Sequence, residues 1–248
     1  MMDKNIDFEA YATLHERIFA ENRLCVSRET NEIEQFWRLT RRMLEVNESM
    51  NLTAVRDAAS VVFLHYADSL MISDDLPHGA TVCDIGCGAG FPSLPLAITR
   101  GDLRILAVDS TEKKVRYVAE TAEYLGISDR LSTLSARAEE LGQSDLREGF
   151  SFVTARAVSN LRMLSELCLP LVKVGGAFLS MKGANWAAEL ANAEQAICLL
   201  GGTVEEQREF EIRNGTVAEK RALLVIRKTS PTPAKYPRSW GKIKSKPL

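Results

Sequence analysis

The sequence has little that would hold a protein in a membrane or direct it out of the cell. Its longest stretch without a charged residue, 85–99, is fifteen residues long and contains three glycines and two prolines. A bilayer-spanning helix needs about 20 consecutive apolar residues. The first residues are charged from the third position onward and lack the apolar segment of a secretory signal. We therefore expect a cytoplasmic protein without a membrane partner.

Cysteine and histidine are also scarce. The five cysteines are an odd number and form no Cys-x-x-Cys pair, which argues against a disulfide framework and against a zinc site. No two of the three histidines are four residues apart, the spacing that places two metal ligands on one helix face. We predict reduced thiols and no bound metal.

Acidic residues are absent from the last part of the chain. Residues 220–248 contain nine Lys or Arg and no Asp or Glu, whereas the preceding residues contain 22 basic and 33 acidic side chains. The net charge of −2 thus divides into about −11 for the body and about +9 for the end of the chain. A separate basic arm attracts polyanions such as nucleic acid by counterion release. A solvated arm without a partner would have the same composition.

The composition is that of a globular protein, with 46% hydrophobic and 26% charged residues among 248. It excludes collagen-like, coiled-coil and largely disordered classes. Apolar residues at helical spacing within 8–19 and 33–44 predict an N-terminal helical extension over 1–60. We expect the main domain over 61–228 and a basic C-terminal tail over 229–248, where three prolines within seven residues predict irregular structure.

Short apolar runs alternate with helical patterns after residue 79. The runs predict strands at Thr81–Ile85, Arg104–Asp109, Arg130–Leu134, Phe150–Arg156 and Gly176–Lys182, and the stretches between them predict helices at Lys113–Leu125, Val158–Leu169 and Trp186–Leu200. Such alternation predicts a parallel sheet with helices on both faces. Two further runs, Glu205–Ile212 and Ala222–Arg227, flank Asn214-Gly215, a strong signal for an antiparallel hairpin.

We therefore predict an α/β fold with a mostly parallel seven-stranded sheet that ends in an antiparallel hairpin. This ending is typical of Rossmann-like class I methyltransferases. A nucleotide-binding dehydrogenase would continue with parallel units instead.

A glycine-rich loop follows the first predicted strand. Asp84 ends that strand, and Gly86, Gly88 and Gly90 occupy alternate positions after it. Glycine lets the backbone turn tightly and approach a ligand, although an ordinary tight turn has the same residues. The spacing differs from the Gly-x-Gly-x-x-Gly of dinucleotide-binding proteins. Asp109, at the end of the next predicted strand, is placed to accept both hydroxyls of a ribose, which S-adenosylmethionine and NAD share.

Two further strand ends carry candidate cofactor contacts. Ala138 and Glu139 follow the third predicted strand, where their backbone groups would border an adenine, although Glu139 is also a favourable acid for a helix start. Arg156 ends the fourth predicted strand, where a guanidinium is able to hold a cofactor carboxylate or a substrate phosphate. The alternative for Arg156 is a salt bridge with a neighbouring acid.

Seven short motifs, in order along the chain, point to one family. They are Asn51-Leu52-Thr53, His65-x-x-Asp68-Ser69-Leu70, Asp84–Leu96 (DIGCGAGFPSLPL), Arg156-Ala157, Gly175-Gly176, Lys182-Gly183 and Tyr236-Pro237-Arg238. Together they resemble the RsmG (GidB) family, over about residues 45–240. The chain departs from that family at Cys87, where a small hydroxyl residue is usual, at Ser93, where glycine is usual, and at Asp109, where glutamate is frequent.

The resemblance implies a methyltransferase that uses S-adenosylmethionine and methylates N7 of a guanosine in 16S ribosomal RNA of the small ribosomal subunit. It also implies cofactor contacts at Gly86, Phe91, Ala138, Glu139 and Arg156. The substrate is either the RNA or a subunit particle, and a monomer is the default expectation.

Guanine N7 has a lone pair and no proton to lose, so methyl transfer needs alignment more than a general base. The sequence has no Asn-Pro motif of the amino-methylating enzymes, and Cys83, Cys87 and Cys168 are poorly placed for nucleophilic catalysis. We therefore assign no catalytic residue. Lys182 and Arg238 are candidate contacts to RNA, although Lys182 is equally explained as a surface lysine.

Three other functions fit part of the pattern. A methyltransferase for a small molecule would not need the basic tail, and activity that survives deletion of 229–248 would favour it. A non-catalytic RNA-binding protein with the cofactor fold would bind RNA without methyl incorporation. A dehydrogenase disagrees with the glycine spacing and the terminal hairpin.

Overall fold

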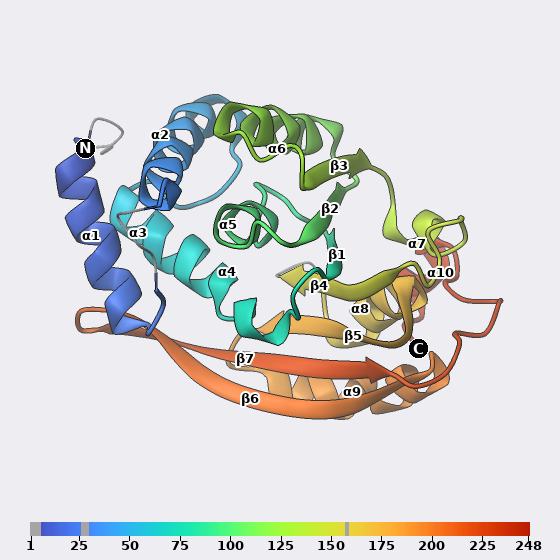
Figure 1. The fold of residues 1–248 in the computed structure, drawn as a ribbon. Coiled ribbons are helices and arrows are strands. Elements are labelled where there is room, and N and C mark those ends of the chain that lie inside the picture. Colours follow the sequence, from blue (N-terminus) through green and yellow to red (C-terminus); the bar gives the residue numbers. More distant parts are fainter. Residues whose placement is uncertain (1–5, 26–29, 157–158) are drawn as a thin grey trace.

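The computed structural model describes residues 6–25, 30–156 and 159–248, which form one sheet covered by helices (Figure 1). The seven strands lie in the order β3-β2-β1-β4-β5-β7-β6. Their bounds are β1 Thr81–Ile85, β2 Arg104–Asp109, β3 Leu131–Ser135, β4 Phe150–Arg156, β5 Val172–Lys182, β6 Gly202–Asn214 and β7 Val217–Lys228. The first five strands pair in parallel, and β7 is antiparallel to β5 and β6. The predicted sheet and terminal hairpin are confirmed.

Four strands differ from the prediction in their bounds. Strand β3 begins and ends one residue later, and β5 begins at Val172, four residues before the predicted start. At this early start a register shift separates the β4 pairs at Phe150 and Phe152, and Gly176 lies so close to β4 that an added Cβ would be 2.3 Å from the Ser151 carbonyl oxygen. The hairpin strands are longer than predicted because pairing continues to Asn214 and Val217 at the turn.

Helices cover both faces of the sheet. Their bounds are α1 Phe8–Glu21, α2 Glu32–Met50, α3 Ala58–Val61, a π-helical turn at Val62–Ala67, α4 Asp68–Leu70, α5 Ser93–Thr99, α6 Glu112–Leu125, α7 Ala138–Leu141, α8 Leu161–Cys168, α9 Trp186–Leu199 and α10 Trp240–Ser245, with single 3-10 turns at Ser73–Asp75 and Leu169–Leu171. Helices α1–α6 share one apolar core with one sheet face, and α7–α10 share a second core with the other face. The predicted helix start at Val158 lies outside the described residues. No described helix is long and apolar enough to span a bilayer.

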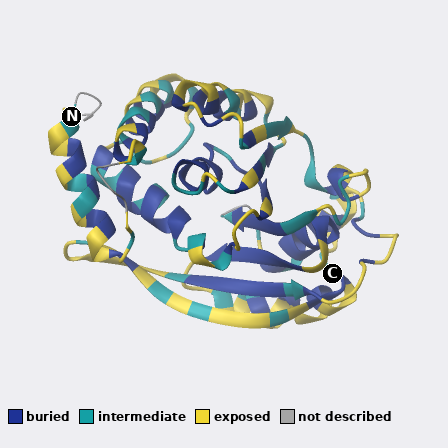
Figure 2. Cartoon of the chain, in the orientation of Figure 1, coloured by how far each residue is buried: buried dark blue, intermediate teal, exposed yellow. Residues whose placement is uncertain are grey.

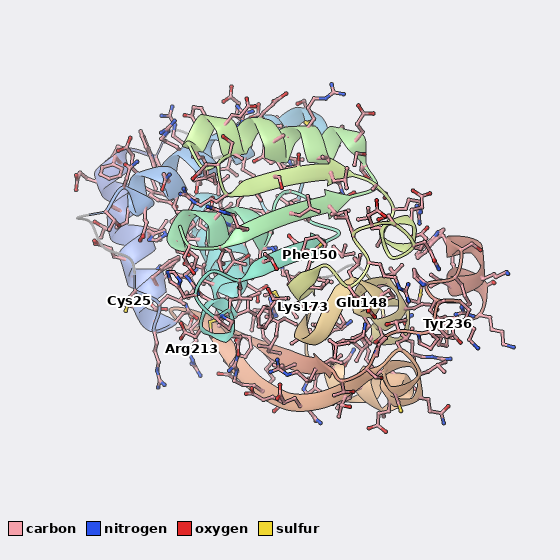
Figure 3. All side chains as sticks on the ribbon, turned by 45° about the vertical axis from the view of Figure 1, so that its right-hand side comes forward. Cys25, Glu148, Phe150, Lys173, Arg213 and Tyr236 are labelled. Atoms are coloured by element: carbon pink, nitrogen blue, oxygen red, sulfur yellow. The ribbon has the colours of Figure 1, made fainter. Side chains whose placement is uncertain are left out.

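The N-terminal helices pack through buried side chains (Figure 2): α1 contacts the π-helical turn and β6, and α2 contacts α5 and α6. The Thr40 hydroxyl lies 3.2 Å from the Tyr11 hydroxyl and 2.9 Å from that of Tyr66, so α1, α2 and the π-helical turn are joined by polar contacts. Asn22, after α1, exchanges two hydrogen bonds with the backbone of Arg213 in β6. Figure 3 shows Cys25 and Arg213 at this same end of the molecule.

The tail was expected to be irregular, but part of it is helical and packed on the domain. Helix α10 buries Ile243 against the second core, and Tyr236 is also buried there. The buried Lys228 ammonium donates to the Leu169 and Val172 carbonyls, to Thr232 and to Glu148. Glu148 and Tyr236 lie on the same side of the molecule in Figure 3. The tail is therefore tied to the sheet, and the division of the chain at residues 60 and 228 stays a prediction.

Candidate active site

The glycine-rich loop joins β1 to α5 at the carboxyl edge of the sheet. Gly86, Gly88 and Gly90 have φ of +74°, +56° and +93°, the region that favours glycine. The Gly86 and Cys87 amides both donate to the Val108 carbonyl of β2, at 2.8 and 2.9 Å. Apart from its own flanking residues, a Cβ built on Gly88 would meet one atom within 4 Å in the described part of the chain, the Gly86 carbonyl oxygen at 3.9 Å. The loop is therefore fixed to the sheet at its start and open around Gly88.

Asp84 lies buried beneath this loop. Its Oδ2 accepts a hydrogen bond of 2.5 Å from the Ser93 hydroxyl, and its Oδ1 has no partner among the described residues. Burial raises the pKa of Asp84 to about 6, and the bond from Ser93 opposes that shift. A buried carboxylate oxygen without a donor is costly. This oxygen is therefore the kind of unpaired group that a bound ligand or water satisfies.

Asp109 ends β2 beside the loop and organises it. Its Oδ2 accepts from the Gly88 amide at 3.1 Å, and its Oδ1 accepts from the Thr111 amide at 2.8 Å. Each carboxylate oxygen has a second lone pair for another donor. A cavity of about 400 Å³ opens here, lined by Leu52, Thr53, His65, Gly86, Cys87, Gly88, Ala89, Phe91, Asp109, Lys114 and Arg156. Four of the six predicted cofactor residues therefore line one cavity.

His65, from the π-helical turn, supports one wall of this cavity. Its ring stacks on Phe91, with centroids 4.5 Å apart and an interplanar angle of 11°. Its Nε2 is 2.9 Å from the Thr53 hydroxyl, and its Nδ1 is 3.4 Å from Arg156. Because a guanidinium only donates, Nδ1 accepts and Nε2 carries the proton. Burial and the Arg156 charge lower the pKa of His65 to about 3, so it is neutral.

Arg156 forms the salt bridge that was the alternative to ligand binding. Its Nη1 donates to Oδ2 of Asp68 at 2.9 Å and to the Leu64 carbonyl at 3.0 Å. The other Asp68 oxygen accepts from Nε of Arg221 at 3.1 Å. The carboxylate is thus held between two guanidinium groups. Arg156 also lines both the 400 Å³ cavity and a neighbouring one of about 600 Å³.

Ala138 and Glu139 begin α7 and do not line the 400 Å³ cavity. Glu139 is buried and accepts from Arg137, which also lies over the Trp240 ring at 4.8 Å. Glu139 lines a separate cavity with Arg137 and the tail residues Arg238 and Trp240. The Ala136 amide donates to the Asp109 carbonyl, so this loop adjoins the end of β2. Contact between these two residues and a cofactor stays a prediction.

The two predicted RNA contacts have acidic partners inside the protein. Lys182 is buried, so it is not the surface lysine of the alternative, and its ammonium donates to Glu189 at 2.8 Å. Arg238 donates from Nε and Nη2 to both oxygens of the fully buried Glu166, at 2.7 and 2.6 Å. Each cation therefore has a structural role as the partner of an acidic side chain. Contact between RNA and either residue stays a prediction.

The lining of the 400 Å³ cavity also includes residues that were not predicted as site residues, among them Leu52, Thr53, His65 and Lys114. The first three belong to the Asn-Leu-Thr and His-x-x-Asp motifs, so the sequence contained a signal for them. Lys114 lies in the first turn of α6 without any motif of its own. The segment before the first strand therefore contributes to the 400 Å³ cavity together with the strand ends.

The buried thiols are poor nucleophiles. Burial raises the pKa of Cys83, Cys87 and Cys168, so these groups stay protonated at neutral pH. Within 6–25, 30–156 and 159–248, no group of three or more His, Cys, Asp or Glu side chains is arranged to hold a metal ion.

Comparisons with known proteins agree with this fold and identify the family. The ribosomal RNA small subunit methyltransferase G of Leuconostoc citreum is 40% identical over 241 residues, 95% of this chain and 99% of the relative. That of Listeria monocytogenes is 44% identical over 214 residues, 85% of this chain and 89% of the relative. A structure of P. horikoshii TYW2 in complex with MeSAdo shares the fold at 15% identity, with a TM-score of 0.53 over 65% of this chain and 62% of that one. The model of the GidB family, rRNA small subunit methyltransferase G, matches residues 32–216, and the chain belongs to this family.

Proposed function

We propose that this protein transfers a methyl group from S-adenosylmethionine to N7 of a guanosine in the 16S rRNA of the small ribosomal subunit. The observation that carries the proposal is a pair of adjoining cavities that share His65 and Arg156 as lining residues. One cavity lies on the glycine loop, and the other extends from Arg156 toward β5 and β7. Two reactants held in neighbouring cavities meet at the shared wall.

The residues of the 400 Å³ cavity fit S-adenosylmethionine. The open space at Gly88 admits a close ligand, whereas the unpaired Oδ1 of Asp84 is buried beneath the loop, outside the cavity lining, where it is an acceptor for a bridging water. Asp109 would accept the ribose hydroxyls through its remaining lone pairs. Gly86, Phe91 and Arg156 would line the remainder, with Ala138 and Glu139 toward the adenine. The cofactor supplies a methyl group on a positively charged sulfonium.

The proposed reaction needs little acid–base catalysis by the protein. Guanine N7 attacks with a lone pair and loses no proton, so alignment and proximity supply most of the rate enhancement. His65 is consistent with this, because it is neutral and its Nε2 proton is directed at Thr53 rather than into either cavity. The chain's residues would therefore position both reactants and exclude water.

Exposed lysines favour RNA over a small molecule as substrate. Lys235, Lys242, Lys244 and Lys246 are exposed on the tail. Such a surface attracts phosphates. Deletion of 229–248 would not distinguish an RNA substrate from a small molecule, because it would also remove the buried contacts of Thr232, Tyr236 and Ile243. The proposal also includes a cytoplasmic location and a monomer.

The test is methyl transfer from labelled S-adenosylmethionine to small subunits from cells that lack this protein. We expect label in the 16S RNA of these subunits and none in subunits from cells that retain the protein. Label in neither sample, together with measurable cofactor binding, would favour a small-molecule methyltransferase. Tight RNA binding without label would favour the non-catalytic alternative.

A further inference from the structure

The cavity of about 600 Å³ beside the 400 Å³ cavity is lined by an ion pair, a buried Lys182 with a half-buried Glu189, that the proposed function does not yet use. Its lining includes the apolar residues Leu64, Ile72, Met181 and Phe210 together with Lys182 and Glu189. The volume is within the usual range for small-ligand sites, which combine apolar walls with a few placed polar groups. A cavity of this composition is suited to a nucleobase.

The ion pair offers one donor and one acceptor side by side. The Lys182 side chain is 7% exposed, and its ammonium donates to the Ser159 carbonyl at 3.0 Å and to Oε2 of Glu189 at 2.8 Å. An ammonium has three N–H groups, so one remains. Oε2 of Glu189 also accepts from the Leu161 amide at 2.9 Å, whereas Oε1 has no hydrogen bond within the described residues.

This arrangement disfavours a phosphate at Lys182. The Glu189 carboxylate is 33% exposed and adjoins the ammonium, so its negative charge would repel a phosphate there. Asp68, the other acid of the cavity, is unavailable because its oxygens are held by Arg156 and Arg221. Lys182 and Glu189 therefore offer a donor and an acceptor to a substrate in this cavity, beside the guanidinium groups of Arg156 and Arg221.

We propose that Lys182 and Glu189 recognise the target base as guanine, an assignment that rests on the proposed function. The third N–H of Lys182 would donate to guanine O6, and Oε1 of Glu189 would accept from the neighbouring N1–H and N2 amino group. Adenine presents an amino group and an unprotonated N1 at these positions, so both contacts would fail. N7 belongs to the five-membered ring of guanine. In this orientation that ring would face the wall that both cavities share, formed by His65 and Arg156.

The test uses small subunits reconstituted with 2-aminopurine at the target position, after mass spectrometry has located the methylated guanosine. This base keeps N7 and the amino group but lacks O6 and the N1 proton. We expect the full-length protein to methylate guanosine about 100-fold more efficiently than 2-aminopurine, measured as kcat/KM. In Glu189→Gln the preference falls below about tenfold, because an amide offers a donor as well as an acceptor whereas a carboxylate only accepts.

Glu194→Gln is the matched control, since Glu194 is exposed on the same helix, α9. It keeps the wild-type preference, and all variants keep the wild-type affinity for S-adenosylmethionine. Should Glu189→Gln fail to fold, Lys182→Met serves in its place and also loses the preference. An unchanged preference in a folded variant with reduced activity would mean that the pair is structural and would overturn the assignment. Absence of transfer by the wild-type protein would instead overturn the proposed function.

Discussion

Gly90 shows how one missing side chain shapes the cofactor loop. Its φ is +93°, and a Cβ there would lie 2.4 Å from Cδ1 of Leu94 and 3.3 Å from Cγ2 of Val118. Leu94 is completely buried, so it has little room to move. The loop and the start of α5 therefore approach each other only because residue 90 is glycine.

We predict that Gly90→Ala lowers the free energy of unfolding by roughly 2–4 kcal/mol, through backbone strain and overpacking together. Urea denaturation measures the change. Gly101→Ala is the control, because a Cβ built on Gly101 would meet no described residue beyond its chain neighbours within 4 Å. It should change stability by less than about 0.5 kcal/mol. Equal effects of the two substitutions would contradict this account of the loop.

Asp109 fixes the glycine-rich loop and is the proposed contact to the ribose of the cofactor. We predict that Asp109→Asn weakens S-adenosylmethionine binding by about tenfold or more, because charge-assisted hydrogen bonds to the ribose become neutral ones. Equilibrium dialysis with labelled cofactor measures the affinity. The exposed Asp129, paired with Arg130, supplies the control Asp129→Asn, which should bind as the wild type does. Unchanged affinity in Asp109→Asn would remove this residue from the site.

At the residue scale, the sequence predicted which side chains gather at the strand ends but not how they pair. Gly86, Phe91, Asp109 and Arg156 do line one cavity. Arg156 pairs with Asp68, which is 88 positions away, and Arg238 with Glu166, which is 72 away. Such partners depend on how distant elements dock, which local periodicity does not encode.

The tail is the element whose behaviour differs most from its sequence pattern. Prolines and lysines predicted irregular structure, but buried groups decide its conformation: Tyr236 and Ile243 pack in the second core, and Lys228 and Glu166 hold it by hydrogen bonds. Hydrophobic burial of a few residues is enough to order a segment of otherwise polar composition. The strands, in contrast, were predictable because their short apolar runs end at turn residues.

We predict that Glu166→Gln loosens the tail, since loss of the charge-assisted bonds to Arg238 costs about 1–3 kcal/mol. Limited trypsin digestion should cleave after Lys235 or Arg238 about tenfold faster than in the wild type. Glu205→Gln breaks an exposed ion pair with Arg227 instead and should leave the cleavage rate unchanged. Wild-type cleavage in Glu166→Gln would show that this pair does not anchor the tail.

The whole molecule contains a buried histidine whose titration couples folding to pH. His15 has no hydrogen-bond partner for either ring nitrogen among the described residues and lies against Phe19 and Phe36. Burial lowers the pKa of His15 to about 3, from 6.5 in the unfolded chain. Below pH 6.5 His15 therefore binds a proton in the unfolded state but not in the folded state. The free energy of unfolding falls as the pH falls toward 3.

We predict that His15→Phe removes the loss of stability that protonation of His15 in the unfolded chain causes. On acidification from pH 7 to pH 5, the free energy of unfolding of the wild type should fall by about 2 kcal/mol more than that of the variant. Urea denaturation at both pH values measures the difference. His78 is exposed, so His78→Gln should keep the wild-type dependence on pH. A His15→Phe profile parallel to that of the wild type would mean that His15 is protonated within the fold.

The architecture of the whole molecule was predictable from the alternation of strands and helices and from Asn214-Gly215, because both are local patterns with a definite topological consequence. The second cavity was not, because its walls come from the π-helical turn and from β5, α9, β6 and β7. The same docking gives Lys182 and Glu189 their shared position, which no spacing in the sequence predicts.

The most direct test of the account is nucleoside mass spectrometry of 16S RNA after transfer of a labelled methyl group to small subunits from cells without this protein. We predict label in 7-methylguanosine at one position of the 16S RNA. Label in another nucleoside, such as a methylated adenosine or cytidine, would contradict both the N7 chemistry and the guanine assignment of the second cavity.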